Sequence, residues 1–323
     1  MSPAATPNLR LRAVLMLLGA NFFWGLSFPT IKALALVHGA LLPDSGTWFT
    51  AAMAVAPRFV LATAVLLLWQ ARTLADTTRR EWHQGVLLGL FASAGMLLQN
   101  DGLLFTAAST SAFLTQFYAI MIPVWLALRH RRNPGALVWA CCALVLAGVA
   151  ILGRFDWHTL SFGRGEVETL LSSVFFMGQI LCLERADFAG NRPAKITLVM
   201  FATEAVVFCA LAGVLAPSAS ALFVPWSSLP WLGLTILLTS FCTLGAFTLM
   251  NTWQPRISAT EAGLIYCVEP IFGSLLALCL PAWFSLWAAI DYPNETATWH
   301  LLVGGGLITL ANVLLQWRPP ART

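Results

Sequence analysis

The chain has 323 residues, of which 59% are hydrophobic and only 10% are charged, and its formal net charge is +4. A soluble domain carries about 25% charged residues, so this sequence has too few charged side chains to cover a surface that faces water. The composition excludes a soluble globular protein and predicts an integral membrane protein.

Long apolar segments follow one another along the chain with short connections. A membrane-crossing helix needs about 20 mostly apolar residues, so the pattern predicts an all-α polytopic membrane protein with ten transmembrane helices. The first segment follows Arg10 and Arg12 as a signal sequence would, but it continues past Lys32 without a small-residue cleavage site and is expected to remain as a helix. The ten segments are 13–37, 51–70, 83–105, 110–128, 136–153, 166–183, 196–216, 229–250, 262–284 and 300–317.

Basic residues indicate how the helices are oriented. With the amino terminus in the cytoplasm, only Arg154 and Arg164 fall outside, whereas fourteen basic residues fall inside. Because cytoplasmic loops carry an excess of lysine and arginine, both termini are predicted to be cytoplasmic. The net positive charge is then explained by the basic cytoplasmic loops. It gives no reason to expect a nucleic-acid partner. The fourteen residues are Arg10, Arg12, Arg72, Arg79, Arg80, Arg129, Arg131, Arg132, Arg185, Arg192, Lys195, Arg256, Arg318 and Arg322.

Cysteine and histidine residues form no pattern typical of a metal site or a catalytic site. The seven cysteines lie inside apolar segments, where they are expected to be small packing residues. The five histidines lie at helix ends or in loops, on different faces of the membrane. We therefore expect no metal, no cofactor and no enzymatic activity.

The two halves of the chain repeat one another. Ser111 and Pro123 recur as Ser258 and Pro270 with the same separation. The repeat unit is five helices, and this odd number makes the two copies enter the membrane from opposite sides. Inverted repeats place a substrate site near the membrane midplane, so we predict a transporter with one repeat in residues 1–153 and the other in 166–323. Further matches are Phe22, Phe23, Gly25 and Lys32 with Phe175, Phe176, Gly178 and Arg185, and Ala147 with Ala311.

The segment from Ser258 to Leu280 places Glu269 and Pro270 side by side in an apolar span. A charged side chain at such depth is costly and is by default a functional candidate. Pro270 removes one backbone hydrogen bond and frees a carbonyl one turn earlier, which a neighbouring helix, a water or a substrate must satisfy. The pair predicts a transport pathway. The alternative is that Pro270 bends the helix for packing while a buried partner neutralises Glu269.

Four groups of residues resemble a known family. They are Trp24 and Gly25 with Phe28 and Lys32, Arg58 with Phe59, Ser111 and Ala112 with Pro123, and Ser258 and Ala259 with Glu269 and Pro270. These residues resemble the EamA family of the drug/metabolite transporter superfamily over essentially the whole chain, in two repeats at 13–153 and 166–317. The resemblance implies a ten-helix, multi-pass carrier of the inner membrane, commonly an exporter of amino acids or other small metabolites, with a central cavity between the repeats.

Two connections are longer than the short turns expected in this family. They run from His38 to Ala51 and from Ser285 to Trp299, and both fall on the outer face in the predicted orientation. We interpret them as surface insertions without function. The alternative is a partial lid that lies along the membrane interface with its tryptophans.

The charged residues inside the spans are the main candidates for the transport pathway. Burial in apolar surroundings favours the protonated form of a carboxyl group, so Glu269, and after it Glu204, are candidates for proton carriage; Glu204 is alternatively a neutral structural acid. Arg58 and Asp101 either line the pathway or form a fixed bridge with each other. Lys32 is either an exit-side charge or reaches to the interface.

Uncharged residues at the same depth complete the predicted pathway. Trp24 and Tyr266 are expected to offer aromatic walls to a substrate, while Gln116 and Tyr118 lie just ahead of the helix break predicted at Pro123. Polar side chains also hold membrane helices together, and this is the alternative for each of them and for other amides such as Gln99, Asn100 and Gln179.

The sequence as a whole predicts a secondary transporter that moves small metabolites by alternating access, surrounded by membrane lipid. Export of amino acids or related compounds, driven by proton exchange or by the substrate's own gradient, is the expected activity. The alternatives are a facilitative or drug-extruding carrier and a membrane-embedded enzyme acting on a lipid. The enzyme would need titratable residues gathered at one interface, and the scattered histidines and the inverted repeat argue against it.

Overall fold

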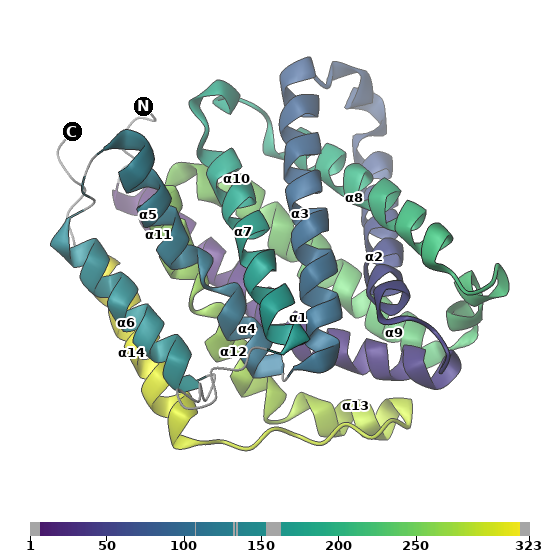
Figure 1. The fold of residues 1–323 in the computed structure, drawn as a ribbon. Helices are drawn as coiled ribbons and strands as arrows, with labels where there is room; N and C mark the ends of the chain where they lie inside the picture. The colour runs from purple at the N-terminus through teal and green to yellow at the C-terminus, as the bar shows by residue number, and fades with distance from the viewer. Residues whose placement is uncertain (1–6, 107, 132, 134, 153–162, 317–323) are drawn as a thin grey trace.

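The structure is a computed structural model that describes residues 7–106, 108–131, 133, 135–152 and 163–316. These residues form helices joined by turns and short loops, and none of them lies in a β-strand. The helices pack as one bundle (Figure 1), which confirms the all-α prediction.

Several long helices are apolar enough to cross a membrane. They are α1 (Pro7–Leu41), α2 (Thr47–Gln70), α3 (Arg79–Phe105), α7 (Arg164–Glu184), α8 (Pro193–Leu215) and the stretch from Leu229 to Arg256 that contains α9 (Leu229–Leu237) and α10 (Ala246–Trp253). The described part of the chain thus has six such helices, or seven if a bent pair near the carboxyl terminus is one span. The protein is a multi-pass membrane protein.

Shorter apolar helices complete the bundle. They include α5 (Tyr118–His130), α6 (Ala136–Leu152) and α14 (Trp299–Gln316). The last two pack along each other at one edge of the bundle, to the left in Figure 1. On the other side, α3 packs against both α7 and α8, and α2 packs along α8.

Two predicted spans are broken helices. The predicted span 110–128 consists of α4 (Ala108–Thr115) and α5, which are separated at Gln116 and Phe117. Pro123 lies inside α5, so the break is not at this proline as predicted. The backbone tolerates Pro123 there because the carbonyl that it frees, that of Ala119, accepts a weak hydrogen bond from Cys142 Sγ at 3.9 Å.

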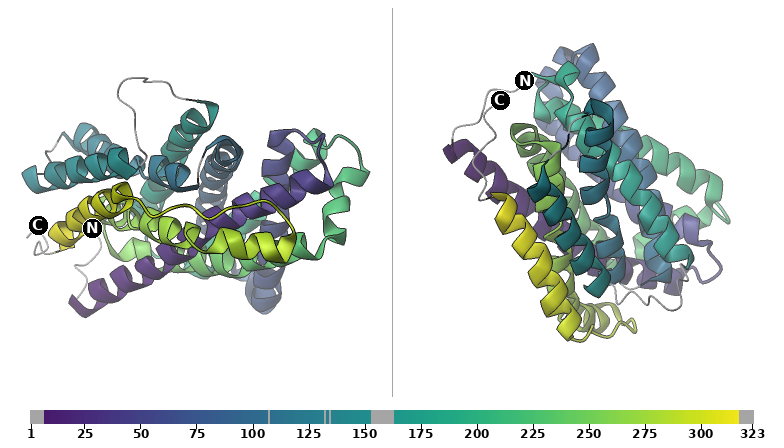
Figure 2. Two further views of the ribbon diagram at one scale, coloured as in Figure 1. Left: turned by 90° about the horizontal axis from the view of Figure 1, so that it is seen from below. Right: turned by 60° about the vertical axis from the view of Figure 1, so that its left-hand side comes forward.

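The predicted span 262–284 consists of α11 (Ala259–Tyr266), α12 (Glu269–Ala277) and α13 (Leu280–Ala288). Pro270 lies in the first turn of α12, where its missing N–H would have no helical partner in any case. The break before Glu269 therefore lies where the Glu–Pro pair predicted it. A second break turns α13 away by 54°, and Figure 2 shows this helix lying across the end of the bundle.

Both connections that were predicted to be long are shorter in the structure, because the flanking helices extend into them. Residues 42–46 alone join α1 to α2, because α1 continues to Leu41 and α2 begins at Thr47. The second connection shrinks to residues 289–298, because α13 continues to Ala288. Residues 38–41 and 47–51 continue the flanking helices although they include polar residues. These extensions were missed because the predicted helix ends were placed where the hydropathy falls.

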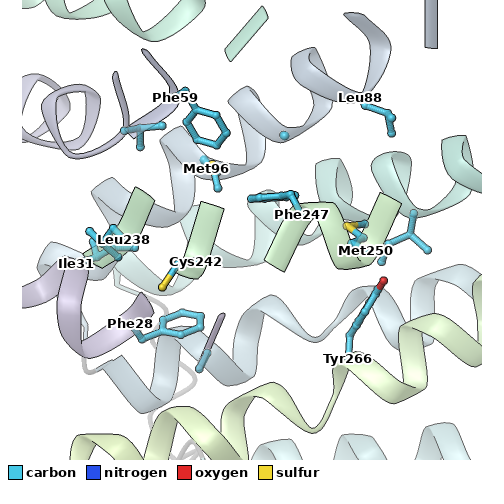
Figure 3. Packing of buried hydrophobic residues seen from close by; sticks show 14 of the residues in the cluster. Phe28, Ile31, Phe59, Leu88, Met96, Leu238, Cys242, Phe247, Met250 and Tyr266 are labelled. Carbon is cyan, nitrogen blue, oxygen red and sulfur yellow. The ribbon is translucent and has the colours of Figure 1, made fainter. Parts of the chain in front are cut away.

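The span that contains α9 and α10 has unusual backbone geometry in its middle. Residues Leu238–Gly245, between the two α-helices, form a π-helix. π-helical turns are rare and are often found at functional sites. Thr239, Cys242 and Thr243 of this stretch are buried in the bundle, and Cys242 lies beside Phe28 in Figure 3.

Close packing of α3 on α8 depends on two glycines one helical turn apart. Gly85 and Gly89 face α8, and small residues at this spacing let membrane helices approach closely. A Cβ atom added at Gly89 would lie 2.6 Å from Thr203 Cβ and 2.8 Å from the Met200 carbonyl oxygen. The second contact is with backbone, so the helices would have to move apart.

We expect Gly89→Ala to lower the stability of the detergent-solubilised protein by about 1–3 kcal/mol, the usual cost of overpacking a close contact. Gly213→Ala is the matched control, because a Cβ at Gly213 of α8 meets no atom within 4 Å. The melting temperatures of the two variants measure the difference. Equal melting temperatures would show that the α3–α8 contact does not require a glycine.

Candidate functional site

A cavity lies inside the bundle between helices from both halves of the chain. It encloses about 610 Å³ of space, counting its open mouth. Five residues predicted from the sequence line it, namely Trp24, Arg58, Tyr118, Tyr266 and Glu269. The others are Ser27, Ile31, Met96, Gln99, Asn100, Thr115, Phe176, Gln179, Ile180, Phe247 and Met250.

Glu269 owes its position in the cavity to the helix break before it. α11 ends at Tyr266 and α12 begins at Glu269, so the two residues that line the cavity stand on either side of a two-residue interruption. Glu269 is 6% exposed, and it is the only carboxyl group among the described lining residues. In its lining position this group can meet a substrate or exchange a proton with the cavity.

Aromatic rings form one wall of the cavity. Trp24 packs edge-to-face against both Phe247 and Tyr266, with ring centroids 5.4 Å apart in each pair. Figure 3 shows Tyr266 pointing toward Phe247 and Met250. The Tyr266 hydroxyl donates to Gln254 Oε1 at 3.0 Å. Trp24 and Tyr266 thus lie together and present aromatic surface to the cavity.

Arg58 also lines the cavity and is almost fully buried, with 1% exposure. Its Nε and Nη2 atoms donate to Thr243 Oγ1 in the π-helix, at 3.2 and 3.1 Å. Its Nη1 finds no hydrogen-bond partner among the described residues. The alternative prediction of a bridge between Arg58 and Asp101 is wrong, because each of them bonds another residue.

Asp101 pairs instead with Arg164, at the end of the bundle where α3 ends and α7 begins. The same guanidinium binds Glu168 at 2.8 Å and lies 4.6 Å from the centroid of the Phe105 ring. Arg164 was predicted to be a basic loop residue, so its pairing with a buried carboxylate was not foreseen. Asp101 does not line the cavity.

Three other predicted residues also lie outside the cavity lining. Lys32 donates from Nζ to the Thr106 carbonyl at 2.7 Å, which ties α1 to the end of α3. Gln116 accepts a hydrogen bond from the Tyr118 hydroxyl at 2.6 Å and so orients a lining residue. Glu204 is fully buried in α8, and both of its carboxyl oxygens lack a hydrogen-bond partner among the described residues.

The structure also supplies lining residues that sequence reasoning did not select. Gln99, Asn100 and Gln179 were interpreted equally as helix contacts, and nothing in their spacing distinguished the two roles. Phe176 and Phe247 were missed because an aromatic residue in an apolar span looks like any other packing residue. In the described part of the chain, no three His, Cys, Asp or Glu side chains are grouped so that they could hold a metal ion.

We expect Arg164→Gln to lower the melting temperature, because it leaves the fully buried Asp101 without its cation. Adding Asp101→Asn should restore part of the loss, since the double variant buries no unpaired charge. The melting temperatures of the two single variants and the double variant form a double-mutant cycle that measures the coupling. Additive losses would mean that the pair does not act as a unit.

Comparisons with known proteins match this architecture. Residues 11–154 match the sequence profile of the EamA-like transporter family. A protein of Archaeoglobus fulgidus described as an uncharacterized transporter is 22% identical over 208 residues, so the match spans 62% of this chain and 62% of that protein. A crystal structure described only as that of a protein is 18% identical and covers 94% of this chain and 96% of its own, with a TM-score of 0.63. This likeness shows a shared fold.

Proposed function

We propose that the chain is a secondary transporter that moves small metabolites across the membrane through the cavity described above, in keeping with the match of residues 11–154 to the sequence profile of the EamA-like transporter family. The observation that carries the proposal is the lining itself. A multi-pass helical bundle buries a carboxyl group and a guanidinium in one cavity, beside a broken helix and an aromatic wall. Ionisable residues inside a membrane protein by default mark a substrate or ion pathway.

The proposed architecture is ten membrane crossings in two inverted five-helix repeats, residues 1–153 and 166–323, with both termini in the cytoplasm. Two features support it. An eight-residue helix followed by a two-residue break occurs in each half, in α4 before α5 and in α11 before α12. The last helices of the two repeats, α6 and α14, pack on each other. The excess of basic residues on one side supports the orientation, and the resemblance to the EamA family is the reason for proposing the inner membrane.

The proposed cargo is an amino acid or a related small metabolite, and the proposed direction is export. Trp24, Tyr118 and Tyr266 contact the substrate, and Glu269 carries the proton that is exchanged for it. Gln116 positions Tyr118. Lys32 and Asp101 lie at one end of the pathway, where their bonds hold α1, α3 and α7 together.

The mechanism follows from the position of the cavity between the halves. Rocking of one five-helix half against the other would open the cavity to each side in turn, as in other inverted-repeat carriers. The described lining contains one carboxyl group and no histidine or cysteine, and its Ser27 and Thr115 hydroxyls donate to backbone carbonyls of their own helices. None of these hydroxyls is thus activated by a base for an enzymatic reaction on a lipid. We therefore favour a carrier over an enzyme.

The test of coupling is Glu269→Gln in proteoliposomes loaded with L-leucine or L-phenylalanine. We expect wild-type protein to exchange protons for one of these compounds and the variant to lose transport driven by a pH gradient, because glutamine cannot release a proton. The measurement is uptake of radiolabelled compound with and without the gradient.

Glu166→Gln, in the first turn of α7 and outside the cavity, is the matched control for this variant and should behave as wild type. Both variants should elute as wild type does in size-exclusion chromatography. Wild-type coupled transport by Glu269→Gln would remove Glu269 from the mechanism and favour a facilitative or drug-extruding carrier.

The inverted repeat predicts that matched positions in the two halves lie on opposite faces. Single cysteines replacing Asp44 and Ser218 should react with a membrane-impermeant maleimide in intact cells, whereas cysteines replacing Asp76 and Asp187 should react only after the cells are opened. All four positions are exposed connections between helices. The two exposed native cysteines, Cys209 and Cys279, are first replaced by alanine. Labelling of Asp44 and Asp187 variants from the same side would contradict the inverted topology.

A further inference from the structure

We infer that Arg58, held in place by Thr243, binds a carboxylate group of the transported substrate. This inference rests on the proposed function and names the chemical class of its substrate.

The first argument is the charge of Arg58 itself. A guanidinium remains protonated in a protein, and at 1% exposure it has lost almost all contact with water. No carboxylate of the described residues lies within 4.0 Å of it, the distance that defines the ion pairs found elsewhere in the bundle. Burying an unpaired charge is very costly, so the site is suited to an anion that arrives from the cavity.

The second argument is the way in which Thr243 holds the guanidinium. One hydroxyl oxygen accepts hydrogen bonds from both Nε and Nη2, which fixes the plane of the group but supplies no negative charge. Nη1 keeps unused donors. Arginine presents donors in a planar fork that matches a carboxylate. Thr243 is therefore a positioning residue, and its place in the π-helix connects substrate binding to a backbone stretch of unusual geometry.

A purely structural role for Arg58 would predict different contacts. A tie between α2 and the π-helix needs only one neutral hydrogen bond, which a glutamine or an asparagine could provide without burying a charge. Buried membrane charges that serve packing are paired, as Asp101 is with Arg164 in this protein. Arg58 also lines the cavity, whereas Asp101 does not. The cost of the unpaired charge is explained if an anion completes the site.

The rest of the lining restricts the kind of anion. Glu269 shares the cavity with Arg58 and can meet an ammonium group or exchange a proton. Trp24, Phe176 and Phe247 provide apolar surface between them. One cation, one carboxyl group and aromatic walls fit a zwitterion with an uncharged, apolar body. An inorganic polyanion or a cationic drug would leave one of the two charged groups unpaired.

Glu204 does not belong to this site. It is fully buried on α8, outside the cavity lining, and both of its oxygens lack a hydrogen-bond partner among the described residues. No ion pair joins it to Arg58 in the described part of the chain, so the anion that completes the Arg58 site is expected to come from the cavity.

The test measures binding by thermal shift of the purified, full-length protein in detergent, independently of transport. The probes are L-phenylalanine and L-leucine, their decarboxylated amines phenethylamine and isoamylamine, and the carboxylates without an amino group, hydrocinnamate and isovalerate. A ligand that binds only the folded state raises the melting temperature in proportion to its occupancy. We expect a shift with the amino acids, a weaker one with the simple carboxylates and none with the amines.

The variants separate recognition from folding. Arg58→Gln should weaken the apparent affinity for the amino acids at least about tenfold, since a charge-assisted bidentate contact is lost, and Arg58→Lys should retain part of it. Thr243→Val should weaken it by a smaller factor. Its matched control is Thr239→Val, because among the described residues the Thr239 hydroxyl in the same π-helix donates to the Thr235 carbonyl one turn earlier and not to Arg58. Arg185→Gln, at an exposed arginine paired with Asp187, controls for the loss of a guanidinium.

The inference is overturned if the amines shift the melting temperature as much as the amino acids, if Arg58→Gln binds as wild type does, or if no carboxylate compound causes a shift. Carboxylate binding without transport in proteoliposomes would support the assignment of Arg58 and overturn the proposed carrier function.

Discussion

The constraint on which the structure depends is the cost of placing charged side chains inside a membrane-embedded bundle. Each such group must have a partner or a use. Asp101 has a partner, since Arg164 binds it at the end of α3 and the contact holds α3 to α7. Arg58 has only a neutral hydroxyl to bond and Glu204 has no hydrogen-bond partner among the described residues, while Glu269 lines the cavity. This contrast separates the charges that hold the bundle together from Arg58 and Glu269, which line the cavity, whereas Glu204 is buried outside the lining.

Helix breaks and close packing position the charged residues that line the cavity. The interruption after Tyr266 brings Glu269 to the start of a new helix, where a carboxyl group is favourably placed near the helix dipole. α1 passes close to this helix, since a Cβ atom at Gly25 would lie 2.7 Å from Phe272 Cβ. The π-helix places Thr243 against the lining residue Arg58. The cavity is thus lined by residues beside these irregular segments and by residues of the regular helices α3 and α7.

The sequence alone predicted the type of protein and identified the side chains that are costly to bury in a membrane. The apolar spans predict a helical membrane protein, and the Glu–Pro pair predicts a break that the structure places immediately before Glu269. Five of the predicted pathway residues do line one cavity. The free-energy cost of burying these side chains in a membrane can be recognised from the sequence alone, because a charged or large amphipathic residue differs clearly from its apolar neighbours in the span.

Pairing and helix geometry could not be predicted in the same way. Arg164 looks like an ordinary loop cation until the fold brings α7 beside the end of α3, so Asp101 seemed equally able to pair with Arg58. The π-helix leaves no signal in the hydropathy of Leu238–Gly245, because one extra residue per turn changes which side chains face inward but not their composition. Apolar lining residues such as Phe247 need the tertiary structure, since only a cavity distinguishes them from the core.

The most direct test of this account records internal pH and labelled uptake together in proteoliposomes of the wild-type protein while amino acids, nucleosides and cationic dyes are added in turn outside. Empty liposomes are the control. The account predicts that the amino-acid class alone triggers uptake and that a proton flux accompanies it. Uptake of every compound at the rate of empty liposomes, or uptake of cationic dyes in preference to amino acids, would contradict it.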